Sequence, residues 1–502
     1  MPDSDWLRCP IFSVEEASGM KRHKILLLNP PGDQRYIRDY YCSHVSKANY
    51  IWHPYDLFVQ SGILGQDHDL VALDANIDNL TFEQAAQALS RMDFDAILML
   101  TGAVSWKNDF SFAGKYLQGK TLIASGDVTV ANGRDLLERY PFLDATLQDF
   151  TLPAINQFLK IKDQCQGGIP DTSEPIPGLL YRNHEGNSIE GPIYPAYGKY
   201  RHPVPRYDLF PWKRYRVPHA RKIPFASIMT DFGCPYHCSF CITGNFGYRM
   251  RDIDNVAEEL AYLKQLGISD LWFKDVVFGV NKRHYNELLD LLTDGPHHFR
   301  WATLSRVDIV TEDLLEKMAR AGCHTIQFGV ESADESILES IEKGISPERV
   351  KEVFRLCRQL GIRTLAHFII GLPGETLESA RKTIEFALEI DPDFASFNVA
   401  SPRLGTALRQ EALEKGYIPN ELTELDNSIT FPTMELGTLS REEVWRLHHE
   451  AIRRFYLRPH YLWRRLVGVR SARELGNSVF EGANLLKHAV RSGIDPADMV
   501  EV

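Results

Sequence analysis

Three cysteines lie close together in the segment Gly233–Cys241, whose sequence is GCPYHCSFC. Cys234, Cys238 and Cys241 have the spacing C-x3-C-x2-C. Cubane iron–sulfur clusters are usually bound by four thiolates, so a set of three leaves one iron open to a substrate or cofactor. The alternatives are a structural zinc site, which usually shows paired C-x2-C elements, and a cluster with a distant fourth cysteine. The spacing favours the cluster with an open iron.

The chain as a whole has the composition of a globular protein. It has 502 residues, 44% of them hydrophobic and 25% charged, which suits two domains and an appendage. The net charge of −11 argues against nonspecific nucleic-acid binding as the main function. The other cysteines are scattered, and no apolar run reaches about 18 residues. We therefore expect no disulfide framework, no secretory signal, no membrane span and a cytoplasmic location.

The first part of the chain alternates short apolar strands with helices. Strands are expected at 24–28, 70–74, 96–100, 121–126 and 145–148, and helices at 54–65, 82–92, 109–117 and 134–140. After a leader at 1–21, this alternation predicts a doubly wound, Rossmann-like α/β domain over 22–160. Ligands of such sheets bind at the carboxyl ends of the strands. The candidate ligand-binding loops are 29–36, 101–108 and 125–131.

A second series of strand–helix units begins after residues 161–222, which we expect to be a linker with one hairpin near 178–193. Strands are expected at 225–230, 270–274, 300–305, 324–329, 363–370 and 394–400. Six such units predict a partial (β/α)6 barrel over 223–420, followed by a C-terminal helical region at 421–502. The cysteine segment directly follows the first barrel strand, and barrels of this kind carry their chemistry at the C-terminal ends of strands.

The cysteine segment resembles the signature of radical S-adenosylmethionine (SAM) enzymes, which also has an aromatic residue before the last cysteine. The resemblance implies a [4Fe–4S] cluster bound by the three cysteines, with SAM chelating the open iron through its amino and carboxylate groups. One electron from the cluster would cleave SAM to methionine and a 5′-deoxyadenosyl radical, which abstracts hydrogen from an unactivated carbon. Tyr236 and Phe240 would contact the cofactor, with Phe240 near the adenine.

Further segments resemble the same superfamily at the ends of later strands. Ser305 and Arg306 follow the third strand, where the matching arginine commonly approaches the SAM carboxylate. Gly329 and Glu331 follow the fourth, near the methionyl or ribose groups. Each match alone has a structural alternative. Their order along the chain makes coincidence a poor explanation.

The remaining strand ends carry additional candidates. Gly371 and Pro373 belong to a turn after the fifth strand that would wall the adenine site. Arg403 follows the sixth strand and Asp275 the second, and both are candidate catalytic residues. For Asp275 the alternative is an acid that caps the next helix.

The order of the two domains resembles the cobalamin-binding subclass of radical SAM enzymes. That group includes methylases of unactivated carbon, the anaerobic magnesium-protoporphyrin monomethyl ester cyclase and hopanoid-modifying enzymes. Asn29–Pro31 and Ile176–Arg182 match its landmarks, and Ser125 and Gly126 occupy the place of a common Gly-Gly pair. The Asp-x-His-x-x-Gly cobalt-binding motif is absent. Cobalamin binding and a domain that only shapes the substrate pocket both stay open.

The reaction class depends on that choice. With cobalamin, methyl transfer to carbon is expected, one SAM supplying the methyl group and a second the radical. Without it, cyclisation, carbon–carbon coupling or desaturation of a lipid or tetrapyrrole would fit, and a non-catalytic corrinoid or redox sensor is a further alternative. The expected partners are a small-molecule or lipid substrate and an electron donor such as flavodoxin or ferredoxin. The basic and aromatic stretch 453–465 either contacts a membrane surface or packs on the protein itself.

Overall fold

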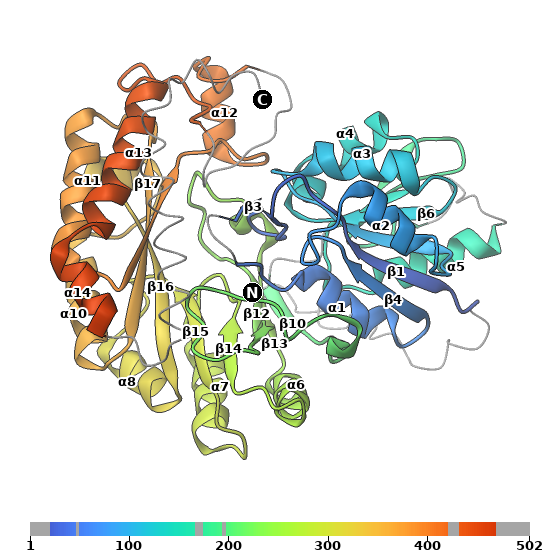
Figure 1. Cartoon of the computed structure of the whole chain (residues 1–502), viewed down its shortest axis with the longest axis horizontal. Helices are drawn as coiled ribbons and strands as arrows, with labels where there is room; N and C mark the ends of the chain where they lie inside the picture. Colours follow the sequence, from blue (N-terminus) through green and yellow to red (C-terminus); the bar gives the residue numbers. More distant parts are fainter. Residues whose placement is uncertain (1–20, 47–49, 166–173, 193–196, 420–430, 468–502) are drawn as a thin grey trace, which may run out of the picture.

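The computed structural model describes residues 21–46, 50–165, 174–192, 197–419 and 431–467. These residues form two lobes joined side by side, an N-terminal lobe and a larger barrel lobe (Figure 1). The cysteine segment lies in the barrel lobe, close to where the lobes meet.

The N-terminal lobe is built on a largely parallel sheet whose order, within the described residues, is β4-β1-β5-β6-β7-β8-β9. The parallel strands are β1 (Lys24–Asn29), β4 (Asp69–Asp74), β5 (Ala96–Leu100), β6 (Thr121–Ser125) and β7 (Ala145–Leu147). The helices are α1 (Tyr55–Leu64), α2 (Phe82–Leu89), α3 (Trp106–Tyr116), α4 (Asp127–Arg139) and α5 (Ala154–Gln164). Ile25 and Leu27 pack with α1 and α5, whereas Leu26 and Leu28 pack with α2, α3 and α4. Helices on both faces confirm the doubly wound, Rossmann-like fold.

The predicted hairpin extends this sheet. Its strands, β8 (Leu179–Arg182) and β9 (Ser188–Glu190), are antiparallel, and β8 pairs with β7. Leu179 and Tyr181 are fully buried in the lobe. Pairing with β8 satisfies the backbone groups along the edge of β7 that would otherwise be open.

The barrel lobe contains six parallel strands in sequence order within the described residues. They are β11 (Ala226–Ile228), β14 (Asp270–Phe273), β15 (Arg300–Ser305), β16 (Cys323–Glu331), β17 (Arg363–Ile370) and β18 (Phe394–Val399). The helices outside them are α6 (Ile253–Gln265), α7 (Lys282–Asp294), α8 (Glu312–Arg320), α9 (Glu335–Ser340), α10 (Pro347–Gln359) and α11 (Leu377–Ile390). The sheet ends at β11 and β18 and stays open between them, which confirms the predicted partial (β/α)6 barrel.

Capping residues fix where the outer helices begin. The hydroxyl oxygens of Thr311, Ser346 and Thr376 each accept a hydrogen bond from a backbone N–H in the first turn of α8, α10 and α11. Pro347 stands at the first position of α10, where its missing N–H costs nothing. Because α8 and α11 begin close to the ends of β15 and β17, the loops before them are short and hold their side chains in place, whereas α9 lies between β16 and α10.

Smaller elements surround the barrel. Strands β10 (Tyr197–Tyr200), β12 (Asp231–Gly233) and β13 (Tyr248–Arg251) form a separate sheet, and the 3-10 helix η4 (Thr243–Phe246) lies between β12 and β13. A short hairpin of β2 (Tyr36–Ile37) and β3 (His44–Val45) projects from the N-terminal lobe, and the 3-10 helix η3 (Tyr207–Leu209) precedes the barrel. The sequence did not predict these elements, because strands of two to four residues carry little periodicity.

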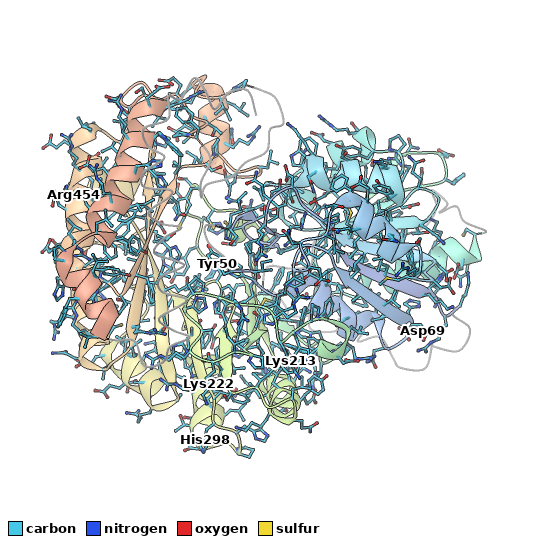
Figure 2. All side chains as sticks on the ribbon, viewed as in Figure 1. Tyr50, Asp69, Lys213, Lys222, His298 and Arg454 are labelled. Carbon is cyan, nitrogen blue, oxygen red and sulfur yellow. The ribbon has the colours of Figure 1, made fainter. Side chains whose placement is uncertain are left out.

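The C-terminal helices are α12 (Ala407–Glu414), α13 (Arg441–Tyr456) and α14 (Pro459–Val467). Helices α13 and α14 lie within the predicted helical region 421–502, whereas α12 precedes it; residues 421–430 and 468–502 of that region lie outside the described residues. Helix α13 packs against β18 and α11, and Arg454 lies on this outer side of the barrel (Figure 2). Among the described helices, none combines the length and apolar character needed to cross a membrane.

Buried ion pairs join the two lobes. In each, an acid of the N-terminal lobe meets a base of the barrel lobe: Asp39 with Lys274, Asp149 with Arg249, and Asp127 with Arg403. These side chains are at most 10% exposed. Removing one partner of such a pair typically destabilises a protein by about 3–5 kcal/mol. The pairs therefore hold the lobes in one relative position.

Candidate active site

The cysteine loop, residues 234–241, is fixed by backbone hydrogen bonds at both ends. The N–H of Cys234 donates to the carbonyl of Gly247 at 2.9 Å, and the N–H of Cys241 donates to that of Cys238 at 3.0 Å. Gly233 has φ +83°, and a Cβ there would lie 2.0 Å from the Gly247 oxygen. Only glycine allows this close approach, which starts the loop at the end of β12.

The three thiols are chemically suited to an iron–sulfur cluster. Cys234 and Cys238 are buried and Cys241 is partly exposed. Burial raises the pKa of Cys234 to about 12 and also raises that of Cys238, so both are neutral thiols until iron binds and stabilises the thiolates. Across the residues that the structure describes, no three His, Cys, Asp or Glu side chains stand ready to hold a single metal ion.

Arg306 lies beside the cysteine loop. It follows β15, and Asp308 holds it through two hydrogen bonds of 3.0 Å, from Nε and Nη2 to the two carboxylate oxygens. Its Nη1 is 3.6 Å from Cys238 Sγ, and its guanidinium lies 3.9 Å from the ring centroid of Tyr236. The structure thus brings together Arg306 and Tyr236, two predicted cofactor contacts that follow different strands of the barrel.

Glu331 forms a buried ion pair that the sequence did not reveal. Its Oε1 accepts a 2.8 Å hydrogen bond from Lys343 Nζ, which also lies 5.8 Å from the centroid of the Phe240 ring. Glu331 has φ +63°, and the pairing of β16 with β17 shifts register between Gly329 and Glu331. A Cβ at Gly329 would lie 2.3 Å from Glu331 Oε1 and 2.7 Å from Lys343 Nζ. Glycine at 329 therefore makes room for the ion pair.

Two other predicted site residues, Ser305 and Asp275, form hydrogen bonds with the backbone of the protein. The Ser305 hydroxyl donates to the Phe278 carbonyl at 2.7 Å, and it is buried. Asp275, fully buried, accepts hydrogen bonds from the Thr230 N–H at 2.6 Å and the Asp231 N–H at 3.2 Å, and burial raises its pKa to about 6. Asp275 thus fixes the turn that leads into β12 and the cysteine loop. Its catalytic role stays a prediction.

The turn after β17 has the geometry that its glycines suggest. Gly371 has φ +89°, and its N–H donates to Glu375 Oε2 at 2.6 Å. Pro373 lies within the turn, and Leu372 contributes its side chain to a cavity. We call it the second cavity, to distinguish it from the first cavity described below. It is lined by Phe240, Ile369, Leu372, Val399, Ala400, Ser401, Arg403 and Leu408. It lies between the cysteine loop and the last two barrel strands.

The loops at the carboxyl ends of β5 and β6, residues 101–103 and 125–127, form what we call the ligand edge. The Ser125 hydroxyl donates to Asp56 Oδ2 at 2.7 Å, and burial raises the pKa of Asp56 to about 7. Gly126 has φ +139°, and a Cβ there would lie 2.0 Å from the Thr101 oxygen. Glycine at 126 therefore lets the two loops pack closely.

The Asn-Pro-Pro landmark surrounds a buried arginine. Arg38 Nη1 donates to Asn29 Oδ1 at 2.9 Å and to the Pro30 carbonyl at 3.0 Å, and Arg38 also pairs with the fully buried Asp109. The landmark is therefore explained by a structural role at the end of β1. No local pattern in the sequence predicts that Arg38 folds back onto it.

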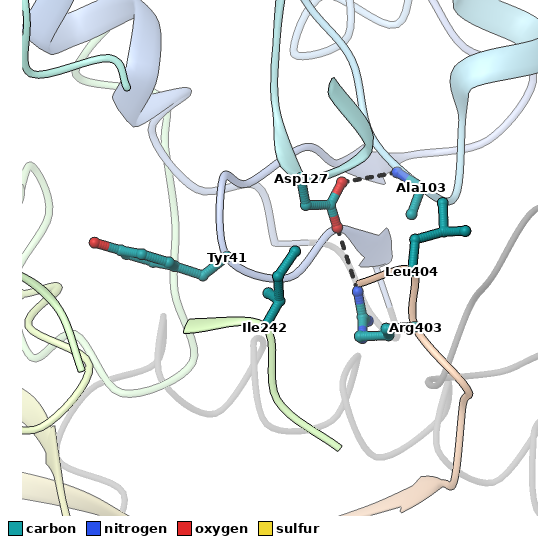
Figure 3. A pocket seen from close by; sticks show the side chains of 6 residues that line it. All are labelled: Tyr41, Ala103, Asp127, Ile242, Arg403 and Leu404. Carbon is teal, nitrogen blue, oxygen red and sulfur yellow. Dashed lines mark hydrogen bonds and ion pairs between the residues drawn. The ribbon is translucent and has the colours of Figure 1, made fainter. Parts of the chain in front are cut away.

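A first cavity lies between the ligand edge and the cysteine loop (Figure 3). It is lined by Tyr41, Ala103, Asp127, Ile242, Arg403 and Leu404. Ile242 directly follows Cys241, and the Tyr41 hydroxyl accepts a hydrogen bond from the Gly233 N–H at 3.3 Å. One cavity therefore has walls from both lobes and reaches the cysteine loop.

A fourth cysteine approaches this region. Cys42 precedes β3 in the N-terminal lobe. Burial raises the pKa of its thiol to about 11, and the nearby Cys241 adds to the increase. Cys42 is therefore the residue to test for the alternative of a distant fourth ligand.

Comparison with known proteins agrees with this geometry. A profile of the radical SAM superfamily matches residues 230–387. The chain is 29% identical to a protein named uncharacterized methyltransferase from Pyrococcus horikoshii, over 88% of this chain and 94% of the relative. It is 24% identical to the anaerobic magnesium-protoporphyrin IX monomethyl ester cyclase of Rubrivivax gelatinosus, over 78% of this chain and 71% of the relative.

The fold of the whole chain also has a solved counterpart. The radical SAM methyltransferase TsrM from Kitasatospora setae, solved with cobalamin and a [4Fe–4S] cluster bound, aligns with a TM-score of 0.63. The alignment covers 95% of this chain and 92% of that chain at 18% sequence identity, so both lobes share its fold. The chain therefore contains a radical SAM domain and is a radical SAM enzyme, a class that works with a [4Fe–4S] cluster, SAM and a reductant.

Proposed function

We propose that the protein is a cobalamin-dependent radical SAM methyltransferase that acts on an unactivated carbon of a small molecule. The observation that carries this proposal is the meeting of the two lobes at the first cavity, which is lined by Ala103 and Asp127 of the ligand edge and by Ile242, the residue directly after Cys241. A corrinoid bound along the ligand edge would lie next to the site of SAM cleavage. The relatives named as methyltransferases and the whole-chain likeness to a fold that holds cobalamin in TsrM support it.

The cysteine loop would bind the [4Fe–4S] cluster through Cys234, Cys238 and Cys241. The cluster supplies one electron for reductive cleavage of the SAM sulfonium. The chain's own part is positioning: Arg306, held by Asp308, places a positive charge beside Cys238, where it suits the SAM carboxylate. The Glu331–Lys343 pair keeps a carboxylate and an ammonium next to Phe240 without a net charge.

We expect the walls of the second cavity to border the adenine of SAM. Phe240, Ile369 and Val399 give it apolar walls, and Ser401 offers a hydroxyl whose oxygen is buried without a described partner. A flat base with polar edges matches such walls, because ring and aliphatic side chains cover its faces while the hydroxyl meets an edge. Tyr236, Gly371 and Pro373 would shape this site from its borders.

The ligand edge fits cobalamin by its chemistry. Gly126 lets the loops pack closely, and the buried Asp127 carboxylate, which accepts a hydrogen bond from the Ser43 hydroxyl, could instead accept one from an amide N–H of a corrin ring. Cobalamin supplies a methyl carrier next to the cluster. No histidine motif for cobalt is present in the sequence, so we propose binding through the ring and its amide arms.

The second candidate is a cobalamin-independent radical cyclisation. The likeness to the magnesium-protoporphyrin cyclase favours it. The Ser125 hydroxyl at the ligand edge also favours it, because this hydroxyl already donates its hydrogen to Asp56 rather than to a ligand. In that case the N-terminal lobe would only shape the substrate site. The two candidates differ in whether a corrinoid binds.

We propose domain boundaries that follow the sheets. The N-terminal domain would extend from residue 22 to about residue 190, because β8 and β9 belong to its sheet, and the barrel would cover 223–420. The electron donor would be of the flavodoxin or ferredoxin class, in the cytoplasm. Arg454 pairs with Glu385, and Arg458 and Arg464 with Asp391, which supports packing of 453–465 on the protein itself rather than on a membrane.

The visible spectrum of the purified protein tests cobalamin binding. Protein from cells supplied with hydroxocobalamin, or incubated with it anaerobically and desalted, should retain about one corrinoid per chain. The cluster contributes its own absorbance, so cyanide extraction and chromatography should quantify the corrinoid separately. Protein that carries an intact cluster and retains no corrinoid would rule out the methyltransferase proposal in favour of the cyclase type.

A further inference from the structure

The inner face of the open barrel is partly accessible, whereas the interior of a closed barrel is filled by side chains. Phe368 of β17 stacks on Phe397, which contacts Phe455 of α13, so this side of the strands faces the outer helices. His367 and Ile369 alternate with Phe368 along β17 and therefore face inward. Both are partly exposed, although the side chains that face the helices are buried. The barrel thus has an inner surface that a small molecule can reach.

A chain of hydrogen bonds crosses this inner face from β17 through β16 to His219. His367 Nε2 lies 3.0 Å from Gln327 Oε1, and Gln327 Nε2 lies 3.4 Å from His219 Nδ1. An amide oxygen only accepts and an amide nitrogen only donates, so His367 Nε2 donates and His219 Nδ1 accepts. Burial lowers the pKa of His219 to about 3, so its ring is neutral. The one ring hydrogen of His219 is therefore on Nε2.

Two indole rings lie beside His219. The ring centroid of Trp272, on β14, is 5.0 Å from that of His219 and 4.7 Å from that of Trp52, which belongs to the N-terminal lobe. His219 Nε2 and the two indole Nε1 atoms are buried, and none has a hydrogen-bond partner among the described residues. We call these three N–H groups the donor cluster. Buried polar groups are nearly always hydrogen-bonded, so three unpaired donors on contacting rings indicate a missing acceptor.

We propose that the donor cluster binds the substrate, and that this substrate is a planar molecule with acceptor oxygens, such as a carboxylate or a ring carbonyl. All three groups only donate, so the ligand must supply the acceptors, and the ring walls suit a flat molecule. Lys274 lies 5.2 Å from the centroid of the Trp272 ring, but it is paired with Asp39, so the neutral donors carry the recognition. The inference rests on the proposed function only in that the enzyme acts on a small molecule, and it holds for both candidate reactions.

The donor cluster lies deeper in the barrel than the predicted cofactor contacts. Trp272 precedes Asp275 by three residues, and Gln327 precedes Glu331 by four. Four residues of a strand span about 13 Å. A substrate whose acceptor oxygens meet the donor cluster therefore extends along the barrel towards the cysteine loop.

Benzoate and benzylammonium test the recognition, because they share a planar ring and differ in carrying acceptors or donors. The full-length, reconstituted protein is labelled with 15N on its eight tryptophan indoles, and Trp52→Phe and Trp272→Phe assign two of the signals. Benzoate should shift both signals and bind at least about tenfold more tightly than benzylammonium, because hydrogen bonds to a charged acceptor contribute about that factor. Equal affinities, or no shift of the Trp52 and Trp272 signals, would overturn the inference.

Variants of the hydrogen-bonded chain test the role of His219. His219→Phe should weaken benzoate binding by about tenfold. Gln327→Glu places a second acceptor oxygen beside His219 Nδ1, so the hydrogen should move from Nε2 to Nδ1 and the preference for benzoate should fall. The 15N shifts of the imidazole ring report the tautomer directly. Unchanged benzoate affinity in His219→Phe, or a hydrogen on Nδ1 in the wild type, would contradict the proposed recognition.

His202 is the matched control. It is also buried, burial also lowers its pKa, and its Nε2 also has no partner among the described residues. Its ring contacts Tyr200 and not the donor cluster. His202→Phe should therefore keep the wild-type benzoate affinity, with melting temperatures establishing that each variant is folded. An equal loss in His202→Phe would overturn the inference.

The same protein preparations separate this inference from the proposed methyl transfer. Protein that binds benzoate at the donor cluster but retains no corrinoid would contradict the methyltransferase proposal and support the donor cluster. Protein that retains a corrinoid but shows no benzoate shift at Trp52 and Trp272 would overturn the donor cluster alone.

Discussion

Arg306 Nη1 lies 3.6 Å from Cys238 Sγ, so the end of β15 meets the cysteine loop. Asp308 fixes the guanidinium from the side away from the thiol. We expect Arg306→Met to weaken SAM binding and cleavage by about 10–100-fold, since hydrogen bonds between charged groups contribute about 1.5–3 kcal/mol. Arg306→Lys should lose less, and iron content should stay at the wild-type level. Unchanged SAM affinity in Arg306→Met would show that this arginine does not contact the cofactor.

The cysteines make a second prediction, which separates the cluster ligands from their neighbour. Cys234→Ala, Cys238→Ala and Cys241→Ala should each abolish the iron–sulfur absorbance after anaerobic reconstitution. Cys42→Ala should retain it, although this thiol approaches Cys241. Iron and sulfide analysis provides the measurement. Loss of the cluster in Cys42→Ala would identify a fourth protein ligand and leave no open iron for SAM.

The Glu331–Lys343 ion pair makes a third prediction. Both side chains are 7% exposed, so Lys343→Met leaves a buried carboxylate without its partner. We expect a loss of about 3–5 kcal/mol in the free energy of unfolding. Lys351→Met is the control, because its pair with Glu389 is about half exposed and should contribute about 0–1 kcal/mol. Denaturant titration of the two variants compares them, and equal losses would contradict the structural role assigned to Lys343.

Asp56 makes a prediction about pH. Burial raises its pKa to about 7, above the 3.8 of an ordinary aspartate, so the folded protein holds a proton that the unfolded chain releases. The stability from this proton is fully present below pH ~4 and is lost as pH rises towards 7, at about 1.4 kcal/mol per pH unit. Asp56→Asn should remove this slope and be more stable than wild type at pH 8.

The control for the pH experiment is Asp135→Asn, at an exposed position of α4. It should keep the wild-type dependence of unfolding free energy on pH between 4 and 8. Other buried acids contribute their own slopes, so the informative quantity is the difference between each variant and wild type. A slope in Asp56→Asn equal to that of wild type would show that Asp56 is ionised in the folded protein.

The sequence predicted the regular elements well, because its apolar strands and capped helices follow strong local patterns. The strand ends then placed the cysteines, Arg306 and Glu331 at one end of the barrel. Local patterns could not reveal partners distant in the chain. Asp127 and Arg403 are 276 residues apart, and no spacing rule joins them.

Lys343 shows the same limit over a shorter distance. It follows α9 with no motif around it, and only the register shift in β16 turns Glu331 towards it. Ser305 shows the reverse, since a hydroxyl expected at the cofactor is used by the Phe278 carbonyl. Side-chain direction at a strand end depends on packing with neighbouring strands, which a single sequence does not specify.

The products formed from SAM test the proposed methyl transfer most directly. Reconstituted protein with hydroxocobalamin, a low-potential reductant and SAM should form S-adenosylhomocysteine, from transfer of the methyl group, and 5′-deoxyadenosine, from reductive cleavage. Cys234→Ala should form no 5′-deoxyadenosine. Formation of 5′-deoxyadenosine without S-adenosylhomocysteine, in protein with an intact cluster and bound corrinoid, would contradict methyl transfer.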